Sequence, residues 1–167
     1  TSDRESMAAK FIACAANVDY QAIDISSFLA ACVSFTEGHR LVFGNVAILS
    51  MALTFAIEHK IPSVAVGLNR LDAEAYLENS PEFLEYISEG LRLVGSDCWL
   101  LAPFHSWTKA EVLRKGVQLG VALEKTWSCM TPVDDVHDGT CSSCQDRIDA
   151  FREAGIHDPT LYANMSR

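Results

Sequence analysis

The apolar positions along the chain follow two patterns, one with the period of a helix and one with the period of a strand. Apolar residues three or four positions apart predict amphipathic helices, whereas short β-branched or alternating runs predict strands. The helical pattern occurs over residues 7–15, 45–60, 81–94, 109–119 and 143–154. The strand pattern occurs over residues 20–25, 63–68 and 98–102. Residues 26–39 fit neither pattern.

Local signals mark where several of these helices begin and end. Ser80 is expected to cap the helix that Pro81 opens, because a hydroxyl before a first-turn proline is a typical helix start. Thr108 and Glu111 have the spacing of a capping box. The helix over residues 45–60 is apolar around most of its girth, so we expect it to be well buried before Pro62 ends it.

Helices that alternate with strands predict an α/β fold with an open, mostly parallel sheet and helices on both faces. Ligands in such folds bind beyond the carboxyl ends of the strands. We expect residues 1–125 to form this α/β domain, and residues 126–167 to form a zinc-binding segment packed on it.

Composition narrows the classes of function. The chain has 167 residues, of which 49% are hydrophobic, so it can bury a sizeable core. Its net charge of −9 argues against a nucleic-acid partner, which requires a basic surface. No apolar run reaches the roughly 20 residues of a membrane-spanning helix. These features predict a soluble, cytoplasmic protein without a membrane partner.

The six cysteines fall into two groups. Cys14, Cys32 and Cys98 stand alone among apolar residues and are expected to be small core residues. The other three lie close together near the C-terminus, and two of them form a C-x-x-C motif. The three clustered cysteines are Cys129, Cys141 and Cys144.

Two thiolates three residues apart, with a third nearby, predict a closed structural zinc site. The fourth ligand is His137 or Asp138, and the commoner use of imidazole beside thiolates favours His137. The alternative for a C-x-x-C motif is a redox pair.

Three loops at helix starts or strand ends are candidates for binding a nucleotide or substrate. The first contains Gly44 and Asn45, and the third contains Lys109, a candidate phosphate contact and catalytic residue. Each has a simpler interpretation, as a helix cap, a turn or a solvated first-turn residue. The second loop contains Gly67, Asn69, Asp72 and Tyr76.

Several short segments, in order, resemble one known family along almost the whole chain. The most specific is Thr126-Trp127-Ser128-Cys129 together with the cysteine motif and the C-terminal Ala154-Gly155-Ile156. The remaining matches are Arg4-Glu5, Ala8-Ala9-Lys10, Phe43-Gly44-Asn45, Ile48-Leu49-Ser50, Gly67 to Asp72, Pro81-Glu82-Phe83, Ala102-Pro103, Thr108 to Glu111, Ala150-Phe151 and Asp158-Pro159. These segments resemble the 7-cyano-7-deazaguanine synthase family of PP-loop ATPases.

The resemblance implies an ATP-dependent ligase that converts 7-carboxy-7-deazaguanine and ammonia to the nitrile, in queuosine biosynthesis. It implies ATP with Mg²⁺ as co-substrate, bound zinc and assembly as a homodimer. The alternative function is a non-catalytic or divergent relative that acts as a base-binding or partner-binding zinc module.

The chain also departs from the family pattern at defined places. The family's S-G-G-x-D-S motif does not occur in the 167 residues, so we expect these residues alone not to release pyrophosphate from ATP. In the segment 73–80 only Tyr76 matches, and the arginine of the family's P-G-R-N motif is missing beside Asn45. One zinc cysteine is replaced, and Gln145 stands where the family usually has an arginine after the last cysteine.

Overall fold

The computed structural model describes residues 3–33 and 44–164, without the side chains of Leu29, Cys32 and Val33. The expectation for Cys32 as a core residue and the match at Phe43 therefore lie outside the described residues. The chain divides into two compact units. One consists of Thr1–Ile23 with Lys109–Arg167, and the other is Asp24–Thr108. The predicted boundary at residue 125 does not coincide with this division and stays a prediction.

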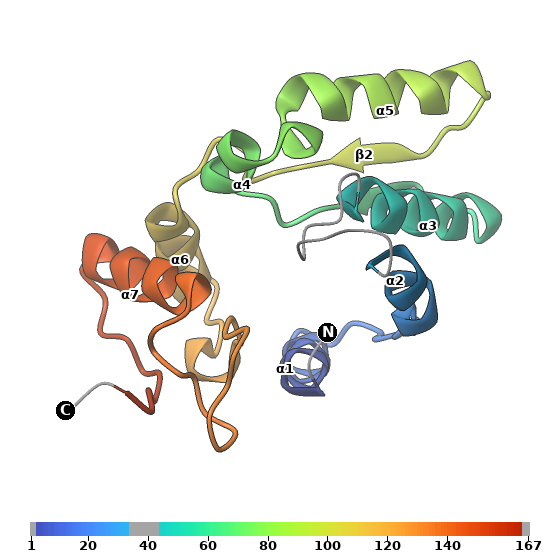
Figure 1. Ribbon diagram of the computed structural model, residues 1–167. Helices are drawn as coiled ribbons and strands as arrows, with labels where there is room; N and C mark the ends of the chain where they lie inside the picture. Colours follow the sequence, from blue (N-terminus) through green and yellow to red (C-terminus); the bar gives the residue numbers. More distant parts are fainter. Residues whose placement is uncertain (1–2, 34–43, 165–167) are drawn as a thin grey trace. The chain divides into compact units, whose positions relative to one another are not determined.

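The unit formed by Asp24–Thr108 contains a parallel pair of strands, β1 and β2, among helices (Figure 1). Val64 of β1 lies opposite Leu100 of β2. The alternation of helices and parallel strands confirms the predicted α/β class. The elements in chain order are α2 (Ser26–Val33), α3 (Gly44–Glu58), β1 (Ser63–Ala65), α4 (Arg70–Ala75), the 3-10 helix η1 (Leu77–Asn79), α5 (Pro81–Leu93) and β2 (Trp99–Leu101).

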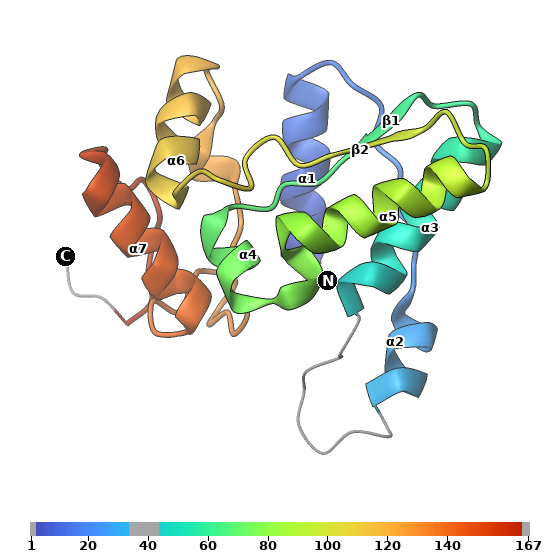
Figure 2. The same cartoon turned by 90° about the horizontal axis from the view of Figure 1, so that it is seen from above.

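The core of this unit lies between α3, α5 and the strands, and α5 runs alongside β2 (Figure 2). Successive strand residues point to opposite sides of a sheet. Accordingly Val64 and Leu100 pack on the core, whereas Trp99 and Leu101 are exposed. The buried core residues are Leu49, Leu53, Ala56, Leu84, Leu91 and Cys98.

Three sequence expectations are wrong. Cys14 is exposed rather than a core residue, whereas Cys98 is buried as expected. Residues 20–25 form no strand, because a strand needs a hydrogen-bonded neighbour and the described residues offer none there. Helix α3 buries only one stripe, while Ile48 remains 49% exposed. Hydrophobicity around a helix shows which faces can be buried, but neighbouring elements decide which faces are covered.

The unit formed by Thr1–Ile23 and Lys109–Arg167 is helical (Figure 1). It contains α1 (Asp3–Ala15), α6 (Lys109–Gln118), the 3-10 helix η2 (Leu123–Lys125) and α7 (Ser142–Ala154). Helices α6 and α7 pack side by side. Arg114 of α6 donates to the carbonyls of Glu153 and Ala154 at 2.8 and 3.3 Å, which satisfies acceptors left free at the end of α7.

Arg147 on α7 joins two segments that flank this helix in the sequence, residues 123–126 before it and residues 158–160 after it. Its side chain is 10% exposed and donates to the hydroxyls of Thr160 and Thr126 at 2.7 and 2.9 Å. It also donates to the carbonyl of Leu123 at 3.0 Å and lies 3.8 Å from the carboxylate of Asp158. One guanidinium therefore fixes three stretches of chain to one another.

Among residues 3–33 and 44–164, no helix combines the length and the apolar character that crossing a bilayer requires.

Candidate functional site

Three thiols and one carboxylate converge beside the start of α7. The ligand atoms of Cys129, Asp138, Cys141 and Cys144 all lie within 4.8 Å of one another. Cys129 lies on the segment that follows η2, Cys141 is the N-cap of α7, and Cys144 is in its first turn. Cys129, Asp138 and Cys144 are buried, so the cluster is largely closed to solvent.

The loop that carries Asp138 is held by its own hydrogen bonds. The Asp138 carboxylate accepts hydrogen bonds from the hydroxyls of Thr131 and Thr140, both at 2.8 Å. It also accepts the backbone N–H groups of Thr140 and Cys141 at 3.1 and 3.2 Å. Gly139 next to it has φ of 82°, a left-handed conformation that a side chain would strain.

The carboxylate of Asp138 remains ionised over a wide pH range. Burial by itself raises the pKa of Asp138, but hydrogen bonds from Cys144, Thr131, Thr140 and the Cys141 backbone outweigh it and lower the pKa below its usual value. The Asp138 backbone N–H also donates to the sulfur of Cys129 at 3.3 Å. The loop thus holds the Asp138 carboxylate and the Cys129 sulfur close together.

The geometry favours Asp138 over His137 as the fourth ligand, which corrects the preference drawn from the sequence. His137 is not part of the cluster, and its ring lies 4.2 Å from the Trp127 ring and 5.9 Å from the Tyr162 ring, centroid to centroid. Its Nε2 accepts the backbone N–H of Ser128 at 3.3 Å, and burial lowers its pKa, so the ring is neutral. Neighbouring side chains on extended backbone point to opposite sides, so only one of the two reaches the cluster.

The donor set fits zinc. Two sulfurs bound to one tetrahedral zinc ion are about 3.8 Å apart, and the sulfurs of Cys141 and Cys129 are separated by 4.0 Å. Burial raises the pKa of the Cys144 thiol above its usual value, so a bound cation would be needed to hold it as a thiolate. Calcium and magnesium prefer oxygen ligands and do not match three sulfurs. The residues present are therefore consistent with a zinc ion held by three cysteines and one aspartate.

The second predicted site, at the end of β1, has most of its polar atoms occupied within the protein. Asn69 caps α4 by accepting the N–H of Leu71 at 2.9 Å, and Asp72 accepts the N–H of Asn69 at 3.0 Å. This capping box supports the simpler interpretation, in which the two residues shape the start of a helix. The binding role of Asn69 and Asp72 is an untested proposal.

A residue that the sequence analysis missed joins this loop to the first one. Asn79 is 3% exposed; its side-chain oxygen accepts a hydrogen bond from Asn45 at 3.0 Å, and its amide donates to the carbonyl of Asp72 at 3.4 Å. Asn45 and Asp72, which are 27 positions apart in the sequence, are thus both hydrogen-bonded to the buried side-chain amide of Asn79. The asparagine before Ser80-Pro81 is an ordinary turn signal, so nothing in the sequence marked it.

The remaining predicted residues are placed individually. Gly44 is the first residue of α3. A Cβ on Gly67 would meet no atom within 4 Å, so Gly67 leaves room near the backbone. Tyr76 ends α4 and is 38% exposed. Lys109 belongs to the other unit, where its ammonium lies 2.8 Å from the carboxylate of Asp146.

Comparisons with known proteins show which family this chain resembles. The family model "Queuosine biosynthesis protein QueC" matches residues 40–155. The 7-cyano-7-deazaguanine synthase of Methanosphaerula palustris is 37% identical over 123 residues, which cover 72% of this chain and 55% of that protein. The proteins of the same name from Nostoc punctiforme and Haloarcula marismortui are 37% and 35% identical over 125 residues each, covering 55% and 53% of their own lengths. The chain spans about half the length of these curated relatives.

Proposed function

The chain belongs to the queuosine biosynthesis protein QueC family, and on this premise we propose that it is the zinc-binding part of a 7-cyano-7-deazaguanine synthase-like ligase. The reaction proposed is the ATP-dependent conversion of 7-carboxy-7-deazaguanine and ammonia to the nitrile, in the cytoplasm. The observation that carries the proposal is the cluster of three cysteines and Asp138, which lies inside the matched region.

Within this function the metal has a structural task. A zinc ion held by four protein ligands keeps no open position for a substrate or an activated water. Cys129 would join the segment after η2 to Cys141 and Cys144 at the start of α7. The thiolates and Asp138 would thus fix the loop between them, and the chemistry would take place elsewhere.

Lys109 is proposed as a phosphate contact of the co-substrate. Catalysis of adenylation depends mainly on positioning and on charge stabilisation of the phosphates, which an ammonium supplies. In the structure this ammonium is paired with Asp146, and both side chains are partly exposed. An exposed ion pair is weak, so exchange of Asp146 for a phosphate would cost little.

The test measures the nitrile directly. The intact gene product is incubated with 7-carboxy-7-deazaguanine, ATP, Mg²⁺ and ammonium, and the product is identified by mass spectrometry. We expect the nitrile from the intact gene product and no pyrophosphate release from the 167 residues alone. Absence of nitrile from a zinc-loaded intact gene product would overturn the proposal.

The second candidate function is a non-catalytic zinc module that binds a base or a protein partner. It is favoured by one observation: Asn69 and Asp72 bond to each other in the capping box. A loop that uses its polar atoms on itself has fewer to offer a substrate base. In the same assay this function predicts zinc binding without turnover by the intact gene product.

A further inference from the structure

A small cavity lies against the metal cluster, within the unit formed by Thr1–Ile23 and Lys109–Arg167. Its volume is about 380 Å³, and Cys129 of the cluster is one of the residues that line it. The other lining residues include two serines and a glutamate, so the cavity suits a small molecule that forms hydrogen bonds. These other residues are Glu5, Trp127, Ser128, Met130 and Ser143.

The hydroxyl of Ser128, the residue next to Cys129, is available to such a molecule. Its oxygen is buried and has no hydrogen-bond partner among the described residues. Buried polar groups without a partner are rare in native proteins, because each one costs the free energy of a lost hydrogen bond. Since Ser128 lines the cavity, water or a molecule with similar donors and acceptors can satisfy the hydroxyl there.

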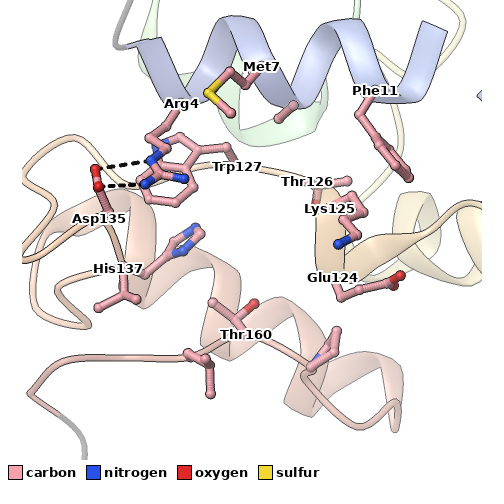
Figure 3. A pocket seen from close by; sticks show the side chains of 14 residues that line it. Arg4, Met7, Phe11, Glu124, Lys125, Thr126, Trp127, Asp135, His137 and Thr160 are labelled. Atoms are coloured by element: carbon pink, nitrogen blue, oxygen red, sulfur yellow. Dashed lines mark hydrogen bonds and ion pairs between the residues drawn. The ribbon is translucent and has the colours of Figure 1, made fainter. Parts of the chain in front are cut away.

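The walls of the cavity are held in place by contacts within the same unit. The indole N–H of Trp127 donates to the carbonyl of Cys129 at 2.9 Å. The Trp127 ring lies 4.2 Å from the ring of His137, and Arg4 of α1 pairs with Asp135 at 2.6 Å (Figure 3). The approach to Cys129 is therefore built into the folded unit, and no rearrangement is needed to open it.

A second thiol lies within reach of Cys129. The sulfurs of Cys129 and Cys141 are 4.0 Å apart, so a shift of about 2 Å brings them to the length of a disulfide bond. Cys141 is the N-cap of α7, where the loop meets the helix, and it is partly exposed. Cys144 lies in the first turn of α7 with none of its surface exposed, so it has less freedom to move. This geometry favours Cys141 over Cys144 as the partner of Cys129.

We propose that Cys129 is a site of oxidation by hydrogen peroxide, which binds in the cavity at the Ser128 hydroxyl, and that oxidation joins Cys129 to Cys141 and releases the metal. The Cys129 thiolate attacks one peroxide oxygen; an S–O bond forms, the O–O bond breaks, and hydroxide leaves. The Cys141 thiolate then attacks the Cys129 sulfur; an S–S bond forms, the S–O bond breaks, and a second hydroxide leaves. The two sulfurs give two electrons to the peroxide, and two protons from solvent convert the hydroxides to water.

The disulfide has a direct consequence for the metal. It removes two of the four ligands of the cluster and leaves Cys144 and Asp138, which are too few for a closed tetrahedral site. Because metal binding and folding of the ligand loop are coupled, the loop between Cys129 and Cys141 then depends on the disulfide alone. This oxidation concerns the cluster itself and does not rest on the proposed reaction.

The first experiment follows zinc and thiols together. The zinc-loaded chain is treated with a small excess of hydrogen peroxide, zinc release is followed with a chelating dye, and the cysteines are mapped by mass spectrometry of a non-reduced digest. We expect about one zinc ion released per disulfide, a linked Cys129–Cys141 peptide, and Cys14 still reduced although it is exposed. Retention of zinc, a Cys141–Cys144 disulfide, or oxidation of Cys14 at the same rate would overturn the proposal.

The second experiment tests the cavity with paired serine variants of equal zinc content. Ser128→Ala should slow zinc release about fivefold at the same peroxide concentration, the factor expected for loss of one hydrogen bond. Ser142→Ala on α7 is the control, because Ser142 does not line the cavity, and its rate should equal that of the wild type. Ser143→Leu, which narrows the cavity, should also slow release and serves as a second variant should Ser128→Ala fold poorly. Release from Ser128→Ala and Ser143→Leu as fast as from Ser142→Ala would refute the role of the cavity.

Discussion

Replacing Arg147 with methionine should destabilise the unit formed by Thr1–Ile23 and Lys109–Arg167 far more than any surface change. Methionine keeps an unbranched apolar side chain but removes the guanidinium, whose central carbon lies 5.1 Å from the centre of the Phe151 ring. The hydroxyl of Thr160 then loses its donor, and the carboxylate of Asp158, 18% exposed, loses the cation 3.8 Å away.

The size of the effect follows from the partners left behind. Removing one member of a buried charged pair costs about 3–5 kcal/mol. The lower end of this range applies here, because two acceptors retain another hydrogen bond. The Asp158 carboxylate still accepts the hydroxyl of Tyr162 at 2.6 Å, and the Leu123 carbonyl still accepts the hydroxyl of Thr126 at 2.7 Å. We therefore expect a loss of about 3 kcal/mol, seen as a fall in the urea midpoint of roughly 1–3 M.

The assay is urea unfolding followed by Trp127 fluorescence in a Trp99→Phe, Trp107→Phe background, so that only this unit reports. The matched control is Arg152→Met on the same helix, whose side chain is 76% exposed and pairs only with Asp149 three positions earlier. That variant should change stability by about 0.5 kcal/mol or less. Equal midpoints for Arg147→Met and Arg152→Met would refute the importance of this network.

Three further predictions concern other parts of the chain. Cys144→Ala should lower the zinc content, measured by elemental analysis, from about one ion per chain to none; full occupancy in this variant would contradict the cluster as the metal site. Asp72→Ala should destabilise the ligand-free protein by about 1–2 kcal/mol through loss of the capping box, and an unchanged melting temperature would instead favour a ligand-binding role. Burial and the Asp158 carboxylate raise the pKa of Tyr162, so its contribution to stability is complete below about pH 10 and is lost as the pH rises through the higher folded-state pKa. The free energy of unfolding of Tyr162→Phe should therefore fall less steeply above pH 10 than that of the wild type. An equal fall in both proteins would exclude this linkage.

The sequence predicted correctly those helices whose ends carry capping residues and whose apolar face is buried by a neighbouring element. Helix α5 begins at Pro81 with Ser80 as its cap, as expected, and α7 ends before Gly155 in the left-handed conformation. Residues 20–25 have the composition of a strand but no partner, and pairing depends on residues distant in the sequence. The partial exposure of α3 has the same cause, because a list of apolar positions does not identify the surface that covers them.

The metal cluster was predictable in its cysteines and not in its fourth residue. Spacing placed Cys141 and Cys144 together, since three positions separate neighbours on one turn. The choice between His137 and Asp138 depended on which of two adjacent side chains faced the thiols. General ligand preference favoured the histidine, whereas the hydrogen bonds from Thr131 and Thr140 hold the aspartate in the cluster. The buried role of Asn79 likewise arises from contacts that no local signal announces.

The division of the chain into a continuous unit and a discontinuous one has a consequence for its synthesis on the ribosome. Arg4 of α1 bonds to Asp135, 131 positions later, whereas Asp24–Thr108 contains all of its own unit. At about 5–20 residues per second, α1 leaves the ribosome on the order of ten seconds before the segments that pack against it exist. The inserted unit can fold during that interval, while the exposed Met7 and Phe11 remain available to chaperones and to incorrect partners.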